Sequence, residues 1–439
     1  MSPEEYRLAA DEETYALVDQ RRNELFSEES GFNIEPAADS LRQRILRGEW
    51  DPDTLLGLTD FVEIAAENSR DYQTRKEALY RSALDLTLER WRFAARGFGS
   101  LDASVVGDGN GATSAQAGGS AGFTKLLGTG ATIVTDIGAS LFRVVTTGDG
   151  WDAVGDIGFA FTQPLMRGMG KRIVQEPLTQ AERDLIYEVR DFERFRRTFA
   201  VDVADRFYDL LQSIDELGNE EENYQDLIKL RVRNDAMAEA GRLSDIEADQ
   251  AQQNESQSEN SLIILRTNLA RQRDQFNLFL GLPVDVTLNL DPDEFDRLDD
   301  QDPLLELISE EWAVPYALEA RLDHQTVADV VADRERQVYV AEDALRAGLS
   351  LDVSATSTSR DGKPASFSSD TTSWSASLAL DLPIDRKAER NAYRRSLINL
   401  EVAHRDLEED ADVITANVRD AIRLVRNSQE SYILQKSVV

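Results

Sequence analysis

The sequence of 439 residues contains no cysteine and only two histidines, and lysine supplies just 7 of its 48 basic residues. The absence of cysteine excludes disulfides, thiolate metal sites and cysteine nucleophiles within the chain. Two histidines leave little material for a histidine-based metal centre. We therefore expect no catalytic site, no cofactor and no metal, and a protein that is not an enzyme.

Long apolar runs are also missing. No stretch approaches the roughly 18 consecutive apolar residues of a transmembrane helix. Residues 1–6 lack the positive charge and the apolar run with which a signal peptide begins. These two absences alone would indicate a soluble cytoplasmic protein, but the pattern along the chain argues otherwise.

Acidic residues outnumber basic ones by 82 to 48, which gives a formal net charge of −34. A surface this acidic repels nucleic acid phosphates, so we expect no nucleic acid partner. The same charge argues against docking on an anionic membrane surface. Apolar residues make up 41% of the chain, which is below the roughly 45–50% of a typical globular domain and indicates little core per residue.

Short segments of the chain alternate apolar and polar residues with a period of two, which is typical of strands with one apolar face. These segments are 98–106, 131–142, 155–162, 351–356 and 373–382, and glycine-rich stretches such as 107–122 are expected to separate them. The apolar positions of the clearest segment, 373–382, are Trp374, Ala376, Leu378 and Leu380. Trp151 and Trp374 stand where two of the strands begin, as aromatic residues at a membrane interface do.

Between these segments the period changes to that of a coiled coil. Apolar residues recur about every 3.5 residues and predict a helix over 177–240, roughly 96 Å long at about 1.5 Å per residue. Gly241 is expected to end this helix. Ser244 and Glu247 form a capping box that begins a second helix, which returns to about residue 280. The result is an antiparallel hairpin too long for a compact domain.

The chain also contains an internal repeat. Residues 159–165 align with 378–384, and each copy then leads into a long helix. We divide the chain into an acidic N-terminal segment or linker (1–57), a first repeat (58–281) and a second repeat (282–439). The second copy ends within a predicted helix, so we expect that its returning helix is missing from this chain.

Other helices are predicted over 3–25 and 316–347, and a further one over 60–91 is expected to begin at a capping box of Asp60 and Glu63.

Two interpretations of the strands remain open. They can form a half-buried sheet of a soluble protein, or the wall of a transmembrane barrel with an apolar outer face and a polar lumen. The long flanking helices cannot fold back as a cover, which favours the barrel. About four strands cannot close such a barrel, since known ones begin at about eight strands. Unpaired strand edges in lipid cost several kcal/mol per group, so other copies of the chain would have to pair them.

Five motifs, in this order, resemble the TolC-like outer membrane efflux proteins over about residues 58–439. They are TQPLMRG at 162–168, ADRFYDLL at 204–211, AGRLSD at 240–245, NLFLGLP at 277–283 and ARLD at 320–323. The resemblance implies a mainly α-helical homotrimer, in which each protomer gives about four strands to one shared β-barrel and long helical hairpins to a periplasmic tunnel. It also implies outer membrane lipid, a periplasmic adaptor (membrane fusion protein) and an inner-membrane pump as partners in tripartite efflux or type I secretion.

The resemblance and the alternation together assign three sets of residues. The tip of the first hairpin, which would dock the adaptor, comprises Gly241, Arg242, Leu243 and Ser244. The junction between barrel and helices comprises Gln163, Pro164, Leu165 and Pro383. The lipid-facing positions of the clearest strand are Trp374, Ala376, Leu378 and Leu380. The chain departs from the family in lacking the second return helix and a signal sequence, and 107–150 leaves room for an extra hairpin or a large external loop.

Several features that could suggest chemistry have simpler explanations. Residues 118–122 fit the nucleophile-elbow pattern, but in a Gly/Ser loop they lack the strand, helix and acid–base partners that an elbow requires. His324 and His404 stand alone on predicted helices and are expected to make surface or inter-helix contacts. Residues 408–410 are expected to form a solvated helix face. The polar run 247–261 is either a solvated helix surface or a water-facing tunnel lining near the tip.

We therefore expect an outer membrane channel that acts as a passive exit duct, with a long periplasmic portion. The alternative is a soluble coiled-coil scaffold or a periplasmic adaptor. Adaptors pair one hairpin with small β-domains, however, and do not need alternating strands bounded by tryptophan.

Overall fold

The computed structural model describes residues 2–27, 31–107, 113–145, 150–299, 308–360, 363–382 and 384–436. The chain forms two compact units. The first comprises Met1–Glu29, Arg81–Arg190 and Ile308–Val439, and the second comprises Ser30–Tyr80 and Asp191–Leu307. Two helices contribute to both units, α4 (Arg70–Arg92) and α6 (Glu176–Glu239).

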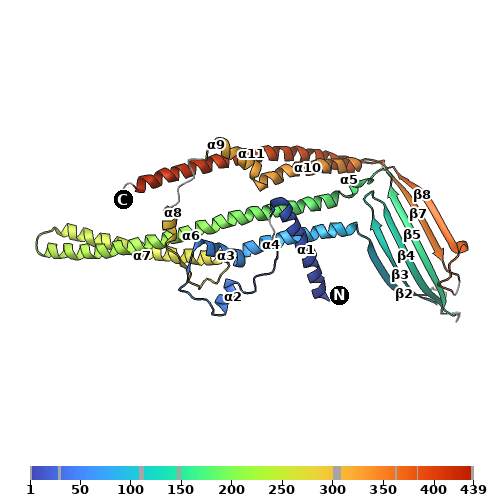
Figure 1. Ribbon diagram of the computed structural model, residues 1–439, viewed down its shortest axis with the longest axis horizontal. Helices are drawn as coiled ribbons and strands as arrows, with labels where there is room; N and C mark the ends of the chain where they lie inside the picture. The colour runs from blue at the N-terminus through green and yellow to red at the C-terminus, as the bar shows by residue number, and fades with distance from the viewer. Residues whose placement is uncertain are drawn as a thin grey trace. The chain divides into compact units, whose positions relative to one another are not determined.

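The first unit is built on an antiparallel sheet of six strands among the described residues (Figure 1). The strands are β2 (Arg96–Gly107), β3 (Thr113–Leu126), β4 (Thr132–Val144), β5 (Asp152–Pro164), β7 (Gly348–Thr358) and β8 (Thr372–Asp381). Their order in the sheet is also their order in the chain, and every neighbouring pair is antiparallel. Strands β2 and β8 are the two edges.

The fold class is confirmed, but the number of strands exceeds the expected four. The main addition is β3, which occupies the glycine-rich stretch that was expected to separate strands. Residues 118–122 lie in the middle of β3 and not in a loop. The sequence hides this strand because its glycine, alanine and serine residues give no apolar alternation. The extra-hairpin alternative for 107–150 is therefore the one that the structure adopts.

The helices of the first unit include α1 (Pro3–Phe26), α5 (Lys171–Val174), α9 (Glu310–Ala320), α10 (Leu322–Asp343) and α11 (Lys387–Lys436). Helices α9 and α10 pack along α11 (Figure 1). The helix predicted over 316–347 begins earlier and is interrupted at Arg321, whose backbone is extended (φ −72°, ψ 122°).

The second unit contains α2 (Leu41–Leu46), α3 (Leu58–Asn68), α7 (Asp245–Leu280), α8 (Glu294–Asp299) and a two-stranded parallel ladder of β1 (Leu55–Leu56) and β6 (Asn289–Leu290). Its core is aromatic: the Phe61 ring lies 5.3 Å from that of Phe207 and 5.2 Å from that of Phe276. Rings at this separation attract one another beyond their burial of apolar area. This core fixes the base of the long hairpin.

The helix predicted over 60–91 differs in two respects. Its N-cap is Gly57, whose amide donates to the Asp60 carboxylate at 2.9 Å. Asp60 is therefore the third residue of the helix and not its N-cap. The helix also breaks at Ser69, which is extended and separates α3 from α4. At this break the backbone of Gly281 packs directly against the backbone of Asn68. A Cβ at Gly281 would lie 1.9 Å from the Asn68 carbonyl oxygen.

The long hairpin is confirmed. Helix α6 has 64 residues, and Gly241 (φ +67°) ends it in the left-handed region that favours glycine. Ser244 and Glu247 form the predicted capping box at the start of α7, and Gly281 (φ +77°) ends that helix. Among the described residues, no helix combines the length and hydrophobicity needed to cross a membrane.

Candidate functional site: a two-faced sheet and a helical hairpin

The six-stranded sheet has two chemically different faces. Residues that lie directly opposite each other in neighbouring strands point to the same side, and successive residues of a strand point to opposite sides. The register therefore assigns every strand residue to a face. One face carries serine, threonine, glycine and six carboxylates: Asp102, Asp136, Asp152, Asp156, Asp352 and Asp381. Among the described strand residues of this polar face, the one basic residue is Arg96, the first residue of β2.

Cross-strand hydrogen bonds connect hydroxyl and carboxylate groups over the polar face. The hydroxyls of Ser100 and Ser120 are 2.9 Å apart on β2 and β3. Thr162 donates to the Asp352 carboxylate at 2.8 Å between β5 and β7. A further pair joins β7 to β8 (Ser354 and Ser375, 2.9 Å). These bonds join three of the five neighbouring strand pairs, and the rings of Phe98 and Phe142 also lie on this face.

The centre of the polar face contains a reciprocal arrangement of β4 and β5. Asp136 lies opposite Gly158, and Asp156 lies opposite Gly138. Each carboxylate lies over the glycine of the other strand: a Cβ at Gly158 would be 2.4 Å from Asp136 Oδ1, and one at Gly138 would be 2.6 Å from Asp156 Oδ1. The glycines therefore provide the space in which the carboxylates sit.

The opposite face is mainly apolar and exposed, and its basic residues, Lys125 and Arg143, stand near the ends of β3 and β4. Its residues include Leu101, Phe123, Ile137, Ile157, Phe159, Trp374, Leu378 and Leu380. The exposed fractions reach 92% for Leu101, 78% for Trp374 and 67% for Leu378. Soluble monomers rarely expose a continuous apolar surface of this kind, which marks a partner or a membrane. Ala376 lies on the same face, so the four predicted positions of β8 share one side.

The predicted junction residues lie where the sheet meets the helices. Pro164 is the last residue of β5, and the Leu165 amide donates to the Leu349 carbonyl at 2.7 Å. The Gln163 side chain donates to the Thr129 carbonyl at 3.3 Å, in the turn between β3 and β4. Pro383 lies outside the described residues. Leu165 and Gln163 therefore connect the end of β5 to β7 and to the turn between β3 and β4.

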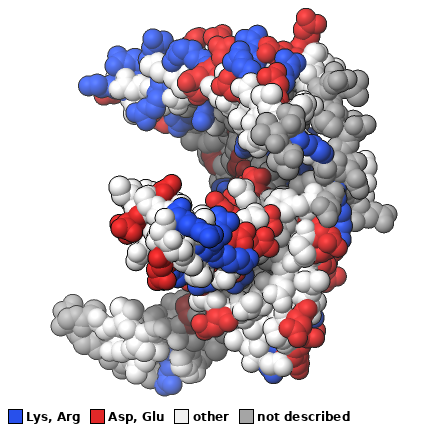
Figure 2. Space-filling view, turned by 90° about the vertical axis from the view of Figure 1, so that its left-hand side faces the viewer, with Lys and Arg blue, Asp and Glu red and all other residues white. Residues whose placement is uncertain are grey.

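The predicted tip of the hairpin is a tight turn with exposed side chains. A Cβ at Gly241 would meet no other part of the chain within 4 Å, and the Arg242 amide donates to the Met237 carbonyl at 2.9 Å. The Ser244 hydroxyl donates to Glu247 at 2.7 Å, and this hydrogen bond lowers the pKa of that carboxyl. Arg242 is exposed. Figure 2, in which the side of the hairpin tip faces the viewer, shows basic and acidic side chains beside one another.

One exposed residue of the tip was missed. Ile246, in the first turn of α7, is 79% exposed. The sequence could have indicated this exposure, because Ile246 directly follows Ser244 and Asp245 in the predicted capping box. An apolar residue at the tip of a hairpin has no neighbouring helix that could bury it.

The polar run 247–261 contacts α6 through polar side chains. Ser258 is buried and donates to Glu220 at 2.6 Å. Glu255 forms an ion pair with Arg231. The run is therefore not wholly solvated, since part of it forms the interface of the hairpin.

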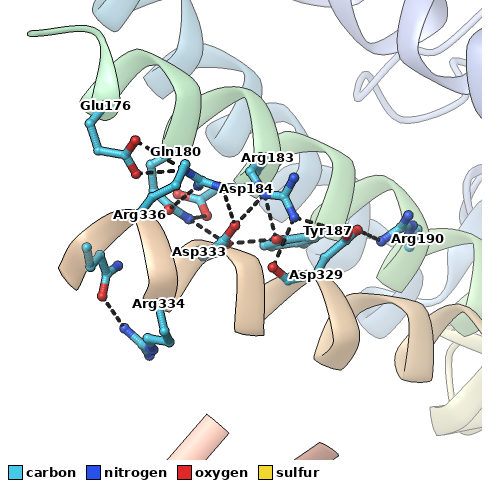
Figure 3. Close-up of polar contacts among 11 residues, drawn as sticks. Glu176, Gln180, Arg183, Asp184, Tyr187, Arg190, Asp329, Asp333, Arg334 and Arg336 are labelled. Atoms are coloured by element: carbon cyan, nitrogen blue, oxygen red, sulfur yellow. Dashed lines mark hydrogen bonds and ion pairs between the residues drawn. The ribbon is translucent and has the colours of Figure 1, made fainter. Parts of the chain in front are cut away.

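A polar cluster between α6 and α10 was not predicted (Figure 3). At its centre is Asp333, which is 3% exposed. Its carboxylate accepts a hydrogen bond from the Tyr187 hydroxyl at 2.7 Å and pairs with Arg183 and with Arg336, the latter at 2.9 Å. Arg183 also reaches Asp329 at 3.1 Å.

Burial and the hydrogen bond to Asp333 raise the pKa of Tyr187. Arg183 and Tyr187 are one helical turn apart on α6, and so are Asp329 and Asp333 on α10. This spacing places each pair on one side of its helix, but neither helix alone indicates that the two pairs meet.

His324 makes the expected inter-helix contact. Its Nδ1 lies 2.7 Å from Asp410 Oδ2, which joins α10 to α11. The expectation that 408–410 form a solvated face is therefore wrong for Asp410, which is partly buried. His404 is exposed. No group of three or more potential ligands in the described part of the chain could hold a metal ion.

Known proteins resemble this chain in fold and not in sequence. No family model and no curated protein matches the sequence. Solved structures do match the fold. The outer-membrane channel OprN has a TM-score of 0.60 at 14% identity, over 90% of this chain and 78% of that one. The Campylobacter jejuni CmeC outer membrane channel has a TM-score of 0.56 at 14% identity, over 95% and 80%.

The open state of the Neisseria gonorrhoeae MtrE outer membrane channel has a TM-score of 0.57 at 12% identity, over 87% of this chain and 75% of that one. This chain has the fold of the TolC-like outer membrane channels.

Proposed function

We propose that this chain is a subunit of an outer membrane efflux or secretion channel that acts as a passive exit duct. The observation that carries the proposal is the sheet with one polar and one exposed apolar face and two open edges. In lipid, backbone groups at a sheet edge must be paired, so such a sheet requires further copies to close it. A soluble scaffold or adaptor has no use for this surface.

In the proposed assembly the apolar face contacts outer membrane lipid and the polar face lines the lumen. Trp374, Ala376, Leu378 and Leu380 are lipid-facing positions. Gln163, Pro164, Leu165 and Pro383 form the junction at which the wall passes into the helices. Three copies form a homotrimer, and 58–281 and 282–439 are its two structural repeats.

The tip of the α6–α7 hairpin is the proposed contact with a periplasmic adaptor, which in turn joins an inner-membrane pump. Gly241 and Ser244 have structural roles as the turn and the cap. Neither role requires Arg242, Leu243 or the exposed Ile246. A cation beside the half-buried Leu243 and the exposed Ile246, at the end of a long hairpin, fits an interface with another helical protein.

Paired substitutions at adjacent positions of β8 test the membrane wall. Leu378→Arg places a charge on the apolar face and should cost roughly 2–4 kcal/mol at mid-membrane. Ser377→Arg, the matched control, places it on the polar face. We expect Leu378→Arg to reduce the amount of trimer in the outer membrane fraction, whereas Ser377→Arg assembles and alters ion conductance. Equal assembly of both variants would show that the apolar face is not a lipid wall.

A further inference from the structure

The sheet contains two more strands than a subunit of this kind was expected to contribute. The additional pair is the β3–β4 hairpin, which separates β2 from β5. We propose that this hairpin is a permanent part of the transmembrane wall, so that three copies close an 18-stranded barrel. The inference rests on the proposed function as a trimeric outer membrane channel. Each of four observations supports it.

The first observation is the pairing. Strand β3 pairs with β2 from Thr113 to Thr124 and with β4 from Ser114 to Leu126, without interruption. Strands β2 and β5 have no ladder with each other in the described part of the chain. If the hairpin left the wall, β2 and β5 would each lose a complete ladder, and lipid offers no substitute for those hydrogen bonds.

The second observation is the length of the strands. Strands β3 and β4 have 14 and 13 residues, and the neighbours β2 and β5 have 12 and 13. A tilted strand needs about 9–11 residues to cross the hydrocarbon core. The hairpin is therefore as long as the rest of the wall, whereas an external loop or a plug has no reason to match this length.

The third observation is the continuity of both faces. Phe123 and Ile137 continue the exposed apolar face across the hairpin, at 45% and 57% exposure. On the other side, Ser120 and Asp136 continue the polar face. A hairpin lying in water on both sides would not need an apolar face.

The fourth observation is the anchoring of the turn between β3 and β4. The Gly170 amide donates to the Thr129 carbonyl at 3.1 Å, and the Thr129 hydroxyl lies 3.2 Å from Gln163 Oε1. Gly130 (φ +93°) approaches so closely that a Cβ there would lie 2.8 Å from the Gly168 carbonyl and 2.9 Å from Pro164 Cγ. The turn is thus bound to the junction at which β5 leaves the sheet.

Six strands in each of three copies give 18, an even number within the range of known barrels. Because barrel diameter grows roughly linearly with strand number, this wall is about 1.5 times as wide as one of twelve strands. Barrels of about 16–18 strands enclose an aqueous channel. The barrel therefore imposes no narrow size filter, and any constriction that selects cargo lies in the helical part.

The direct test is to count strands. The full-length channel is purified from outer membranes, placed in lipid nanodiscs and imaged by electron cryo-microscopy. We expect a trimer with 18 strands. The control variant replaces residues 108–150 with Asn-Gly, which joins β2 to β5 at the same end of the sheet and should close twelve strands. A trimer of twelve strands in the unmodified protein, with β3 and β4 outside the wall, or a twelve-stranded dimer would overturn the inference and leave the channel function intact. If no membrane barrel is found, the proposed function itself is wrong.

A second measurement does not depend on the deletion variant. Because the chain has no cysteine, Asp136→Cys and Ile137→Cys each introduce one thiol at adjacent positions of β4. A charged, membrane-impermeant maleimide should label the Asp136→Cys channel at least tenfold faster in outer membranes, and the difference should vanish in denaturant. Similar rates at both positions would show that β4 has water on both sides and would overturn the inference.

Discussion

The buried carboxylate of Asp333 offers the sharpest test of how α6 is held to α10. Asp333→Ala removes the group that pairs with Arg183 and Arg336 and accepts from the Tyr187 hydroxyl. Breaking a buried ion pair by removing one partner costs about 3–5 kcal/mol, because a buried charge is left without compensation. The two arginine side chains are 24% and 19% exposed and keep other partners, namely Asp329 and Glu176. We therefore expect the lower end of that range, about 3 kcal/mol.

The assay is urea-induced loss of the helical circular dichroism signal of the purified protein in detergent. Asp333→Asn keeps an acceptor for Tyr187 and should cost less, about 1–2 kcal/mol. The matched control is Asp420→Ala, which removes a carboxylate whose partner Arg423 is also exposed. That change should cost at most about 1 kcal/mol. If Asp333→Ala destabilises no more than Asp420→Ala, the cluster does not hold α6 to α10.

Three further predictions concern other parts of the molecule. Because the pKa of Tyr187 is raised, the unfolded tyrosine loses its proton first, so stability should be complete below about pH 10 and fall as the pH rises above it. Tyr187→Phe should remove that slope in pH-dependent urea titrations. Gly281→Ala should cost about 2–5 kcal/mol, because of its positive φ and the close Asn68 carbonyl, whereas Gly218→Ala within α6 should be neutral or stabilising by up to about 1 kcal/mol; equal urea midpoints would contradict this. Arg242→Glu combined with Leu243→Ser should leave trimers intact but weaken adaptor cross-linking and lower drug resistance, and undiminished cross-linking would remove the docking role.

The long helices were predictable because their signals are local. The 3.5-residue period, the left-handed Gly241 and the capping box of Ser244 and Glu247 each depend on residues within one or two turns. The break at Ser69 was not predictable, because its location depends on Gly281, more than 200 residues further along the chain. Local patterns locate a helix, whereas tertiary packing decides where it is interrupted.

The candidate site was predictable in part for a similar reason. Strand β8 has large apolar residues at every second position, so its two faces are visible in the sequence. The α6–α10 cluster is not visible in this way, since Arg183 and Asp333 come from separate segments and each is ordinary on its own helix. Likewise, nothing near Asp410 in the sequence indicates that His324 lies 2.7 Å away.

Glycine in the sheet explains why the strand count could not be obtained from the sequence. A glycine inside a strand ordinarily weakens it and indicates a loop or a bulge. In β3, the strand that was missed, a Cβ at Gly119 would instead lie 2.6 Å from Leu101 Cδ2 and one at Gly122 would lie 2.8 Å from Phe98 Cζ. The glycines that make β3 look like a loop thus provide the space for large side chains of the neighbouring strand β2. A strand whose small residues lie beside the large residues of its neighbour has no apolar alternation of its own. That it belongs to the wall can be recognised only from the pairing with its neighbour, here β3 with β2.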